Sequence, residues 1–435
     1  MMKIQFLITA VFLGSSLFTG ALSAQQTLTD TEKSIISDVD AAFEQQLSFL
    51  EKVVNISSGS RNLKGVRETG DAFMAEFGQL GFENRWIDMP KEMDRAGHMF
   101  SKKTFGSGGK KIMLIGHLDT VFPHDSPFQK FVRNGDKATG PGITDMKDGN
   151  VIILYALKAL IEGGHLKQGA VSVFFTGDEE STGKPLSISR GELIEVAKAN
   201  DIALNFESGS KGYAVIGRRG SSGWKLSVSG KRAHSAGVFS EYVGAGAIFE
   251  ASRILNDFYN EVKGEHGLTF NPGVIAGGTF VTEGDAGANY SAFGKTNVVA
   301  QTVVVKGGLR FLSDEQLQGA RAKMRAVVSR HLPQTDANIE FIDSYPAMTE
   351  TTANRALLAK LSDVSVAMGM EPLKAYDPTK RGAADISFVA PHVTSMDALG
   401  GAGGGSHTPN EWADLVSIKQ ATERTAVFLY RLLNE

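Results

Sequence analysis

The stretch AVSVFFTGDEESTG, residues 170–183, runs from an apolar segment directly into three consecutive acidic residues. Its first half predicts a buried strand, which would end at Asp178, Glu179 and Glu180. Neighbouring carboxylates repel one another and resist removal from water. A solvated turn is one interpretation, because charged side chains lie mostly at the surface. The alternative is a cation bound at this point, and the rest of the chain decides between the two.

Outward from this stretch, predicted strands and helices alternate. The segment KKIMLIGHLDTVF (110–122) predicts a strand that ends near His117, and NVIILYALKALIEGG (150–164) predicts a buried helix. A helix over 189–200 and a strand over 201–208 follow. This alternation is typical of an α/β fold with a mainly parallel sheet. Ligands bind beyond the carboxyl ends of such strands, where four candidate residues are expected to lie: His117, Glu179, Glu180 and Glu207.

The pattern changes between residues 217 and 344. This block predicts strand, helix, strand, strand, helix and strand, which is consistent with an inserted α+β, ferredoxin-like domain. We therefore predict a catalytic domain over 25–216 and 345–435, interrupted by an insert over 217–344. Within the insert, the stretch 271–290 is expected to lengthen a loop.

The N-terminus and the composition limit where the protein acts and what it binds. Residues 1–24 combine a lysine, an apolar run and small residues, which predicts a signal peptide and a periplasmic or secreted protein. A membrane anchor is the alternative, but the apolar run is short and broken, so we expect no membrane association after signal removal. The net charge is −3 and no long basic stripe occurs, which argues against a nucleic-acid partner. The chain contains no cysteine, which excludes disulfides and thiolate metal ligands.

Five residues are candidate metal ligands: His117, Asp145, Glu180, Glu207 and His407. Two histidines and three carboxylates suit zinc or a similar divalent ion. Two ions fit this set better than one, because one carboxylate can bridge while each ion takes one histidine and one further carboxylate. Each residue alone also has an ordinary structural interpretation, such as a helix cap for Asp145. Their joint placement at strand ends and glycine-rich loops favours the metal site.

The motifs GHLDTVF, GPGITDMKDGN, TGDEESTG, NFESGS, GKRAHSAG and GGGSHTPNEW occur in this order along the chain. In this order they resemble the dinuclear-zinc metallopeptidases of the glutamate carboxypeptidase and aminoacylase type. The resemblance covers most of the chain after the signal peptide. It implies a zinc-peptidase catalytic domain and an insert that serves as a lid and dimerisation domain.

The resemblance also implies roles for the site residues. Asp145 would bridge two zinc ions, with Glu180 and His407 completing one site and His117 and Glu207 the other. Glu179 would be the general base that takes a proton from a water shared by the two ions. Asp119 would orient His117, since a carboxylate behind a ligating histidine fixes its tautomer. Asp178 is expected to be structural.

Further residues match positions that bind substrate in the family. His234 would stabilise the oxyanion in the site of a partner subunit, which implies a homodimer. Asn297 and Arg310 match lid residues that bind a substrate carboxylate or the oxyanion, and Arg381 is a candidate contact in a segment that departs from the family pattern. Two other departures are Asp148, where a small residue is usual, and Tyr345, where a basic residue is frequent in glutamate-releasing members.

These inferences predict an exported zinc-dependent exopeptidase of the carboxypeptidase type, acting on a small peptide. It would hydrolyse a peptide or amide bond beside a free carboxylate. A deacylase of N-acyl amino acids is the nearest alternative, because it uses the same chemistry. A non-catalytic binding protein is an alternative of another class, and the intact Glu179 and ligand set argue against it.

Overall fold

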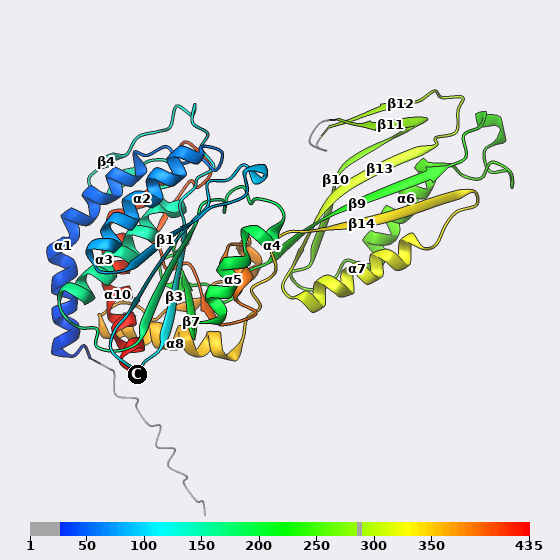
Figure 1. The fold of residues 1–435 in the computed structure, drawn as a ribbon. Coiled ribbons are helices and arrows are strands. Elements are labelled where there is room, and N and C mark those ends of the chain that lie inside the picture. Colours follow the sequence, from blue (N-terminus) through cyan, green and yellow to red (C-terminus); the bar gives the residue numbers. More distant parts are fainter. Residues whose placement is uncertain (1–26, 285–288) are drawn as a thin grey trace, which may run out of the picture.

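The computed structural model describes residues 27–284 and 289–435, so the predicted signal peptide lies outside the described residues. Two regions stand side by side, each built on its own sheet (Figure 1). The chain enters the smaller region near residue 217 and returns near residue 344, and the larger region is formed by the segments on either side. Among the described residues, no helix is long and apolar enough to cross a membrane.

The larger region contains a six-stranded sheet in the order β1-β2-β6-β3-β7-β16. The strands β6, β3, β7 and β16 are parallel, whereas at one edge β2 is antiparallel to both β6 and β1. The fold is therefore a mixed α/β fold. The strand bounds are β1 (Glu83–Ile87), β2 (His98–Thr104), β3 (Lys111–His117), β6 (Ala170–Thr176), β7 (Ile202–Asn205) and β16 (Thr394–Met396).

Both faces of this sheet are covered, which explains the continuous apolar runs in its central strands. In β3, Ile112 and Leu114 belong to one apolar cluster, while Met113 and Ile115 belong to another on the opposite face. The first cluster packs against helices α1 (Asp30–Val54), α2 (Leu63–Gln79), α3 (Asp148–Glu162), α8 (Thr352–Ala367) and α10 (Leu415–Leu433). The second packs against α5 (Gly191–Lys198) and α9 (Ile386–Val389).

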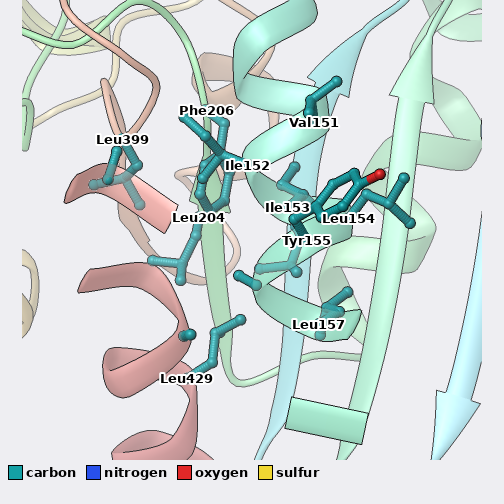
Figure 2. Packing of buried hydrophobic residues seen from close by; sticks show 14 of the residues in the cluster. Val151, Ile152, Ile153, Leu154, Tyr155, Leu157, Leu204, Phe206, Leu399 and Leu429 are labelled. Atoms are coloured by element: carbon teal, nitrogen blue, oxygen red, sulfur yellow. The ribbon is translucent and has the colours of Figure 1, made fainter. Parts of the chain in front are cut away.

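Helix α3 lies at the centre of the larger cluster. Its residues from Val151 to Leu157 are buried, and β7, α10 and the segment after β16 cover one side of the helix (Figure 2). Leu204 and Phe206 approach from β7 and the residues after it, Leu399 from the segment after β16, and Leu429 from α10. This packing holds the first turn of α3 against the strand ends, and Asp145 lies just before that turn.

The smaller region is a four-stranded antiparallel sheet in the order β10-β13-β9-β14 with two helices. Its elements in chain order are β9 (Gly220–Gly230), α6 (Ala247–Glu261), β10 (Thr269–Gly278), β13 (Thr302–Phe311), α7 (Asp314–Val328) and β14 (Thr335–Asp343). Alternate residues of β9, among them Trp224, Leu226 and Val228, are buried in a separate apolar cluster. This strand–helix–strand–strand–helix–strand order is the one that the sequence predicts.

The prediction of a longer loop over 271–290 is wrong for most of that stretch. It forms much of β10 and then a hairpin of β11 (Phe280–Glu283) and β12 (Tyr290–Phe293), in which Phe280 stacks on Phe293. β-forming residues such as Val274, Ile275 and Val281 satisfy their backbone groups by pairing, the first two with β13 and the third with β12.

Short elements connect the main ones. Four short strands form one small sheet: β17 (Gly403–Gly404), β18 (Trp412–Asp414), β5 (Lys137–Thr139) and β4 (Val132–Asn134). Two others pair with each other: β8 (Tyr213–Ala214) and β15 (Lys374–Ala375). The remaining turns are η1 (Lys91–Met93), η2 (Ile143–Lys147), α4 (Leu186–Ser189), η3 (Ser235–Gly237) and η5 (Pro378–Lys380).

Candidate metal centre

Three parallel strands deliver the first candidate ligands to one edge of the sheet. His117 is the last residue of β3, Glu180 follows β6, and Glu207 follows β7. Because β6, β3 and β7 are neighbours and parallel, their carboxyl ends lie together. The acidic residues after 170–176 therefore lie at the edge of the sheet where parallel α/β folds bind ligands, and not in a turn exposed to solvent.

The other two candidate ligands, Asp145 and His407, lie on two loops that a strand pairing holds together. Asp145 lies in the turn η2, where its backbone departs from helical geometry before α3 begins. His407 lies between β17 and β18, and it adopts a positive φ of 64° after the glycines of that loop. Strand β18 pairs with β5, which precedes the Asp145 turn, so the two loops are held side by side.

The five side chains form two half-sites that share Asp145. One oxygen of Asp145 lies 3.3 Å from Nε2 of His117, and the other lies 3.1 Å from Nε2 of His407. Glu207 is 3.7 Å from the same nitrogen of His117, whereas Glu180 is 3.2 Å from that of His407. Each half-site thus has one histidine, one carboxylate of its own and one oxygen of the shared carboxylate. This is the division that the sequence predicts for two ions.

The electrostatics of the chain fit divalent cations at this place. Burial, reinforced by the charge of Asp145, raises the pKa of Glu207 to about 8. The hydrogen bonds that His407 donates to Asp145 and Glu180 raise the pKa of His407 to about 11. The protein part of the site is therefore an excess of negative charge in a poorly solvated place, which divalent ions would offset. Histidine and carboxylate donors without cysteine are ligands that zinc accepts, although the donor set does not exclude other divalent metals.

Glu179 lies beside these ligands without belonging to the pairs that share Asp145. Its carboxylate, His117 and Glu207 each offer an atom within 4.8 Å of the others. Burial raises the pKa of Glu179 well above its usual value. A carboxylate in this position can take up and release a proton next to the ligands, which is the behaviour expected of a general base.

Asp119 is buried behind the ligands and has contacts that the sequence did not predict. Its carboxylate accepts hydrogen bonds from the backbone N–H of Glu179 at 2.9 Å and of Glu180 at 3.1 Å, and from Ser60 Oγ at 2.6 Å. Nδ1 of His117 lies 2.9 Å from the main-chain carbonyl of Asp119 and 3.6 Å from its carboxylate. The residue therefore orients His117 mainly through its carbonyl and orients the acidic segment through its side chain.

Three other acidic or aromatic residues singled out in the sequence lie around the site, two of them buried and Tyr345 half-buried. Asp178 is paired with the buried Arg190, as expected for a structural residue. Asp148, the departure from a small residue, is fully buried in the first turn of α3 and does not face solvent. The hydroxyl of Tyr345 donates to the main-chain carbonyl of Glu179 at 2.9 Å, which ties the return point of the inserted region to the acidic segment.

The inserted region places its three predicted site residues in two different locations. His234 forms a β-bridge with Val298, next to Asn297, and both predicted residues are exposed beyond the outer end of β9. Strand β9 has 11 residues, so it carries His234 roughly 35 Å from the connection to the larger region. Arg310 is exposed on β13 opposite Ser221, close to that connection. None of the three lines the cavity at the metal ligands.

Basic residues do line that cavity, which has a volume of about 300 Å³. Arg381, which the sequence singles out, lies there together with Lys380 and Arg218. The guanidinium of Arg381 donates to the main-chain carbonyl of Ser208, and its buried Nε has no hydrogen-bond partner among the described residues. Arg218 donates to Asp397 and to the carbonyl of Gly382, so it braces the loop that carries Arg381.

Glu411 is a buried residue of the site that sequence reasoning missed. Its carboxylate accepts the backbone N–H groups of Gly142, Thr144 and Asp145 at 3.1, 2.9 and 3.1 Å. Glu411 lies four residues after His407, so it connects the two loops that carry ligands. The sequence did place Glu411 in the motif GGGSHTPNEW, close to the predicted ligand His407. The spacing of the motif does not indicate which backbone groups the carboxylate contacts. Arg218 and Lys380 were missed for the same reason.

Comparison with known proteins agrees with this geometry. Residues 113–434 match the sequence profile of Peptidase family M20/M25/M40. The chain belongs to this family. Among M20 relatives, carboxypeptidase G2 of Pseudomonas sp. (strain RS-16) is 29% identical over 393 residues, which is 87% of this chain and 88% of that protein. This match confirms the resemblance to dinuclear-metal peptidases that the motifs indicated.

Two further proteins are similar to this chain, one in sequence and one in structure. A succinyl-diaminopimelate desuccinylase of Gluconacetobacter diazotrophicus is 25% identical over 367 residues, covering 81% of this chain and 89% of that enzyme. The solved structure of aminopeptidase PepT from Bacillus cereus superimposes with a TM-score of 0.72 at 19% identity, over 89% of this chain and 98% of that one. The structural match shows a shared fold, and the sequence matches show that this M20 chain is a hydrolase of the peptidase and amidohydrolase type.

Proposed function

We propose that this protein is a zinc-dependent exopeptidase of the carboxypeptidase type, which hydrolyses a peptide or amide bond beside a free carboxylate. The observation that carries the proposal is the cavity in which the metal ligands and three cationic side chains face one space: Arg218, Lys380 and Arg381. An arginine that keeps unused N–H groups beside a hydrolytic centre is suited to hold a carboxylate, because its fork matches both oxygens.

The proposal assigns each residue of the site a separate role. His117 and Glu207 would hold one ion, Glu180 and His407 the other, and Asp145 would contact both, as the two half-sites suggest. When bound, the two ions supply Lewis acidity toward the scissile carbonyl and a water that is nucleophilic near neutral pH. Glu179 would accept the proton of that water and later pass it to the departing nitrogen. Arg381 would fix the carboxylate, which sets the position of the bond.

A deacylase of N-acyl amino acids is the second candidate. Its substrate also carries a free carboxylate beside the scissile amide, so the same basic cavity would accept it. The similarity to carboxypeptidase G2 favours the first candidate, and the similarity to a desuccinylase keeps the second open. A purely binding role is disfavoured because Glu179 stands beside a complete set of ligands.

The first experiment compares hydrolysis of dipeptides, N-acetyl amino acids and their C-terminal amides by the purified protein, before and after chelation and zinc addition. The proposal expects about two zinc ions per chain, cleavage that chelation abolishes, and a strong preference for the free carboxylate over the amide. Faster hydrolysis of N-acetyl amino acids than of dipeptides would select the deacylase. A zinc-loaded protein that cleaves none of these substrates would refute both candidates.

We also propose that the protein is exported and acts as a homodimer through the inserted region. The apolar side chains exposed on α6 and β10 support a dimer: Ile248, Phe249, Val274 and Ile275. The exposed position of His234 and Asn297 at the outer end of the insert is compatible with a contribution to a partner's site. Sedimentation analysis tests the dimer, and N-terminal sequencing of protein recovered from the periplasm or medium tests removal of residues 1–24.

A further inference from the structure

A second cavity, of about 410 Å³, lies in the larger region between α8 and α10. Its floor is the first half of α10, and its walls are the end of α8 with the following turn and the loop before β8. It shares no lining residue with the cavity at the metal ligands. The polar residues of its lining are Ser210, Lys211, Ser365, Glu371, Asp414, Ser417, Gln420 and Arg424.

Arg424 is the unusual member of this lining. It follows Ser417 and Gln420 at helical spacing, so the three side chains share one face of α10. The guanidinium forms no hydrogen bond or ion pair with any residue within 27–284 or 289–435. Burial lowers its pKa to about 10, yet it remains charged at neutral pH. Arg424 is half-buried, and its five N–H donors are free to bind an acceptor that enters the cavity.

Among the described residues, the other polar groups of the cavity do not pair with this cation, on which the charge of the neighbouring Glu423 also acts. The carboxylate of Asp414 caps the first turn of α10 by accepting the N–H groups of Val416 and Ser417. Glu371 is exposed, as is Lys211, so these two charges lie at the rim in contact with water. The hydroxyl of Ser365 is buried and has no hydrogen-bond partner among the described residues. The interior of the cavity therefore holds hydrogen-bond donors that have no acceptor among the described residues.

Much of the remaining wall is apolar, through Tyr213, Met370, Leu373 and Val416. A cavity of this size with an apolar wall and one cationic fork suits an organic acid better than an inorganic anion, which would leave the apolar surface unpaired. We propose that this cavity binds a small organic molecule through a carboxylate held by Arg424. This site is separate from the proposed catalytic function and does not depend on it.

Backbone segments connect the lining of this cavity to two of the predicted metal ligands. The N–H of Gly400, which lines the cavity, donates to the carbonyl of the ligand residue Glu207 at 3.0 Å. The N–H of Ala402 is held by Ser417 Oγ at 2.7 Å, and Ala402 leads directly into the loop of His407. A bound acid would therefore contact segments whose other ends carry two predicted metal ligands.

The test is calorimetric titration of the full-length, zinc-loaded protein with 4-bromobenzoate, whose bromine can also be located by anomalous diffraction. We expect binding, with the bromine in the cavity beside Arg424. The variant Arg424→Gln should weaken binding about tenfold or more, since it removes a charge-assisted bidentate contact. The matched control Arg325→Gln, an exposed arginine of α7, should bind as the wild type does, and 4-bromobenzamide should not bind.

Three results would overturn the proposal. The first is equal affinity of Arg424→Gln and wild type. The second is loss of binding in Arg381→Gln with retention in Arg424→Gln, which would assign the acid to the metal-centre cavity. The third is inorganic phosphate binding as tightly as the aromatic acid. If Arg424→Gln does not fold, Gln420→Trp fills the cavity from the same helix face and should abolish binding. All readouts are independent of turnover, so failure of the catalytic proposal leaves the test intact.

Discussion

The carboxylate of Asp119 accepts the backbone N–H of Glu179 at 2.9 Å. Asp119 follows β3 and Glu179 follows the neighbouring strand β6, so this hydrogen bond positions the predicted base. The same carboxylate also holds the N–H of Glu180 at 3.1 Å. Asp119 is completely buried, and burial raises its pKa to about 7. A single side chain thus positions both the predicted general base and a predicted metal ligand.

Replacing Asp119 with asparagine tests this relationship. The amide keeps one oxygen but turns an NH₂ group toward backbone donors, so at least one of the two N–H groups loses its acceptor. We expect the metal affinity to fall about 10–100-fold and kcat to fall with it. Chelator titration and steady-state kinetics measure both. Ser60→Ala, which removes only one donor to the same carboxylate, should have a much smaller effect. Unchanged kinetics in Asp119→Asn would contradict the assigned role.

Glu179 and Glu180 are adjacent in sequence, but their replacement by alanine should have different effects. Glu179→Ala should keep about two ions per chain and lose turnover by roughly 10³-fold or more, because it removes proton transfer and leaves the ligands. Glu180→Ala should lose metal from the half-site of His407. Elemental analysis and kinetics on the two variants separate the roles. Substantial activity in Glu179→Ala would show that another group is the base.

Glu411 should act on metal affinity without touching the metal. Its replacement by glutamine leaves one oxygen for three backbone N–H groups, and the amide nitrogen would face one of them. We expect the metal dissociation constant to rise about 10–100-fold and the free energy of unfolding to fall by about 1–3 kcal/mol. The control is Glu340→Gln on the exposed face of β14. Normal metal affinity in Glu411→Gln would mean that the loop of Asp145 holds its shape alone.

Arg381 should determine recognition of the substrate carboxylate. Arg381→Gln is expected to raise KM about 10–100-fold for a substrate with a free carboxylate, because a charge-assisted bidentate contact is lost. The same variant should leave hydrolysis of the corresponding C-terminal amide nearly unchanged. Lys198→Gln, a surface change on α5, is the control. Equal effects on acid and amide substrates would assign Arg381 a structural role.

The sequence predicted the elements that depend on local pattern. The apolar runs ending at His117, at the acidic segment and at Glu207 indicated parallel strands, and parallel strands require those residues to meet. The order of elements in the insert was also readable from alternation and helical spacing. The strands in 271–290 were missed because their partners are remote or reciprocal: β10 pairs with β13, and β11 pairs with β12.

The parts that could not be predicted depend on contacts between distant segments. Glu411 reaches backbone groups about 270 residues away, and nothing in the motif specifies them. Tyr345 and Glu179 are separated by 166 residues, yet a side-chain hydroxyl meets a carbonyl there. Arg310 looked like a site residue from the motif, but its place in β13 keeps it out of the metal-centre cavity. Long-range side-chain to backbone contacts leave no periodic signal in the sequence.

Stability should depend on pH through Glu423, which lies on α10 next to Asp40 of α1 and Lys419. Burial, with Asp40 nearby, raises its pKa from 4.5 to about 7. The folded chain therefore holds a proton that the unfolded chain releases between about pH 4.5 and 7, so the free energy of unfolding falls as the pH rises through this window. Because the group is partly solvated and shares its environment with Asp40, the loss is about 1–2 kcal/mol.

The variant Glu423→Gln isolates this contribution. Its amide can still donate to Asp40 but cannot ionise, so it resembles the protonated glutamic acid of the folded wild type. We expect the two proteins to unfold alike in urea at about pH 5, and the variant to be more stable by about 1–2 kcal/mol at about pH 8. Glu340→Gln should show no such trend. A difference that stays constant between these pH values would mean that Glu423 is ionised in the folded protein throughout, with Lys419 as its partner.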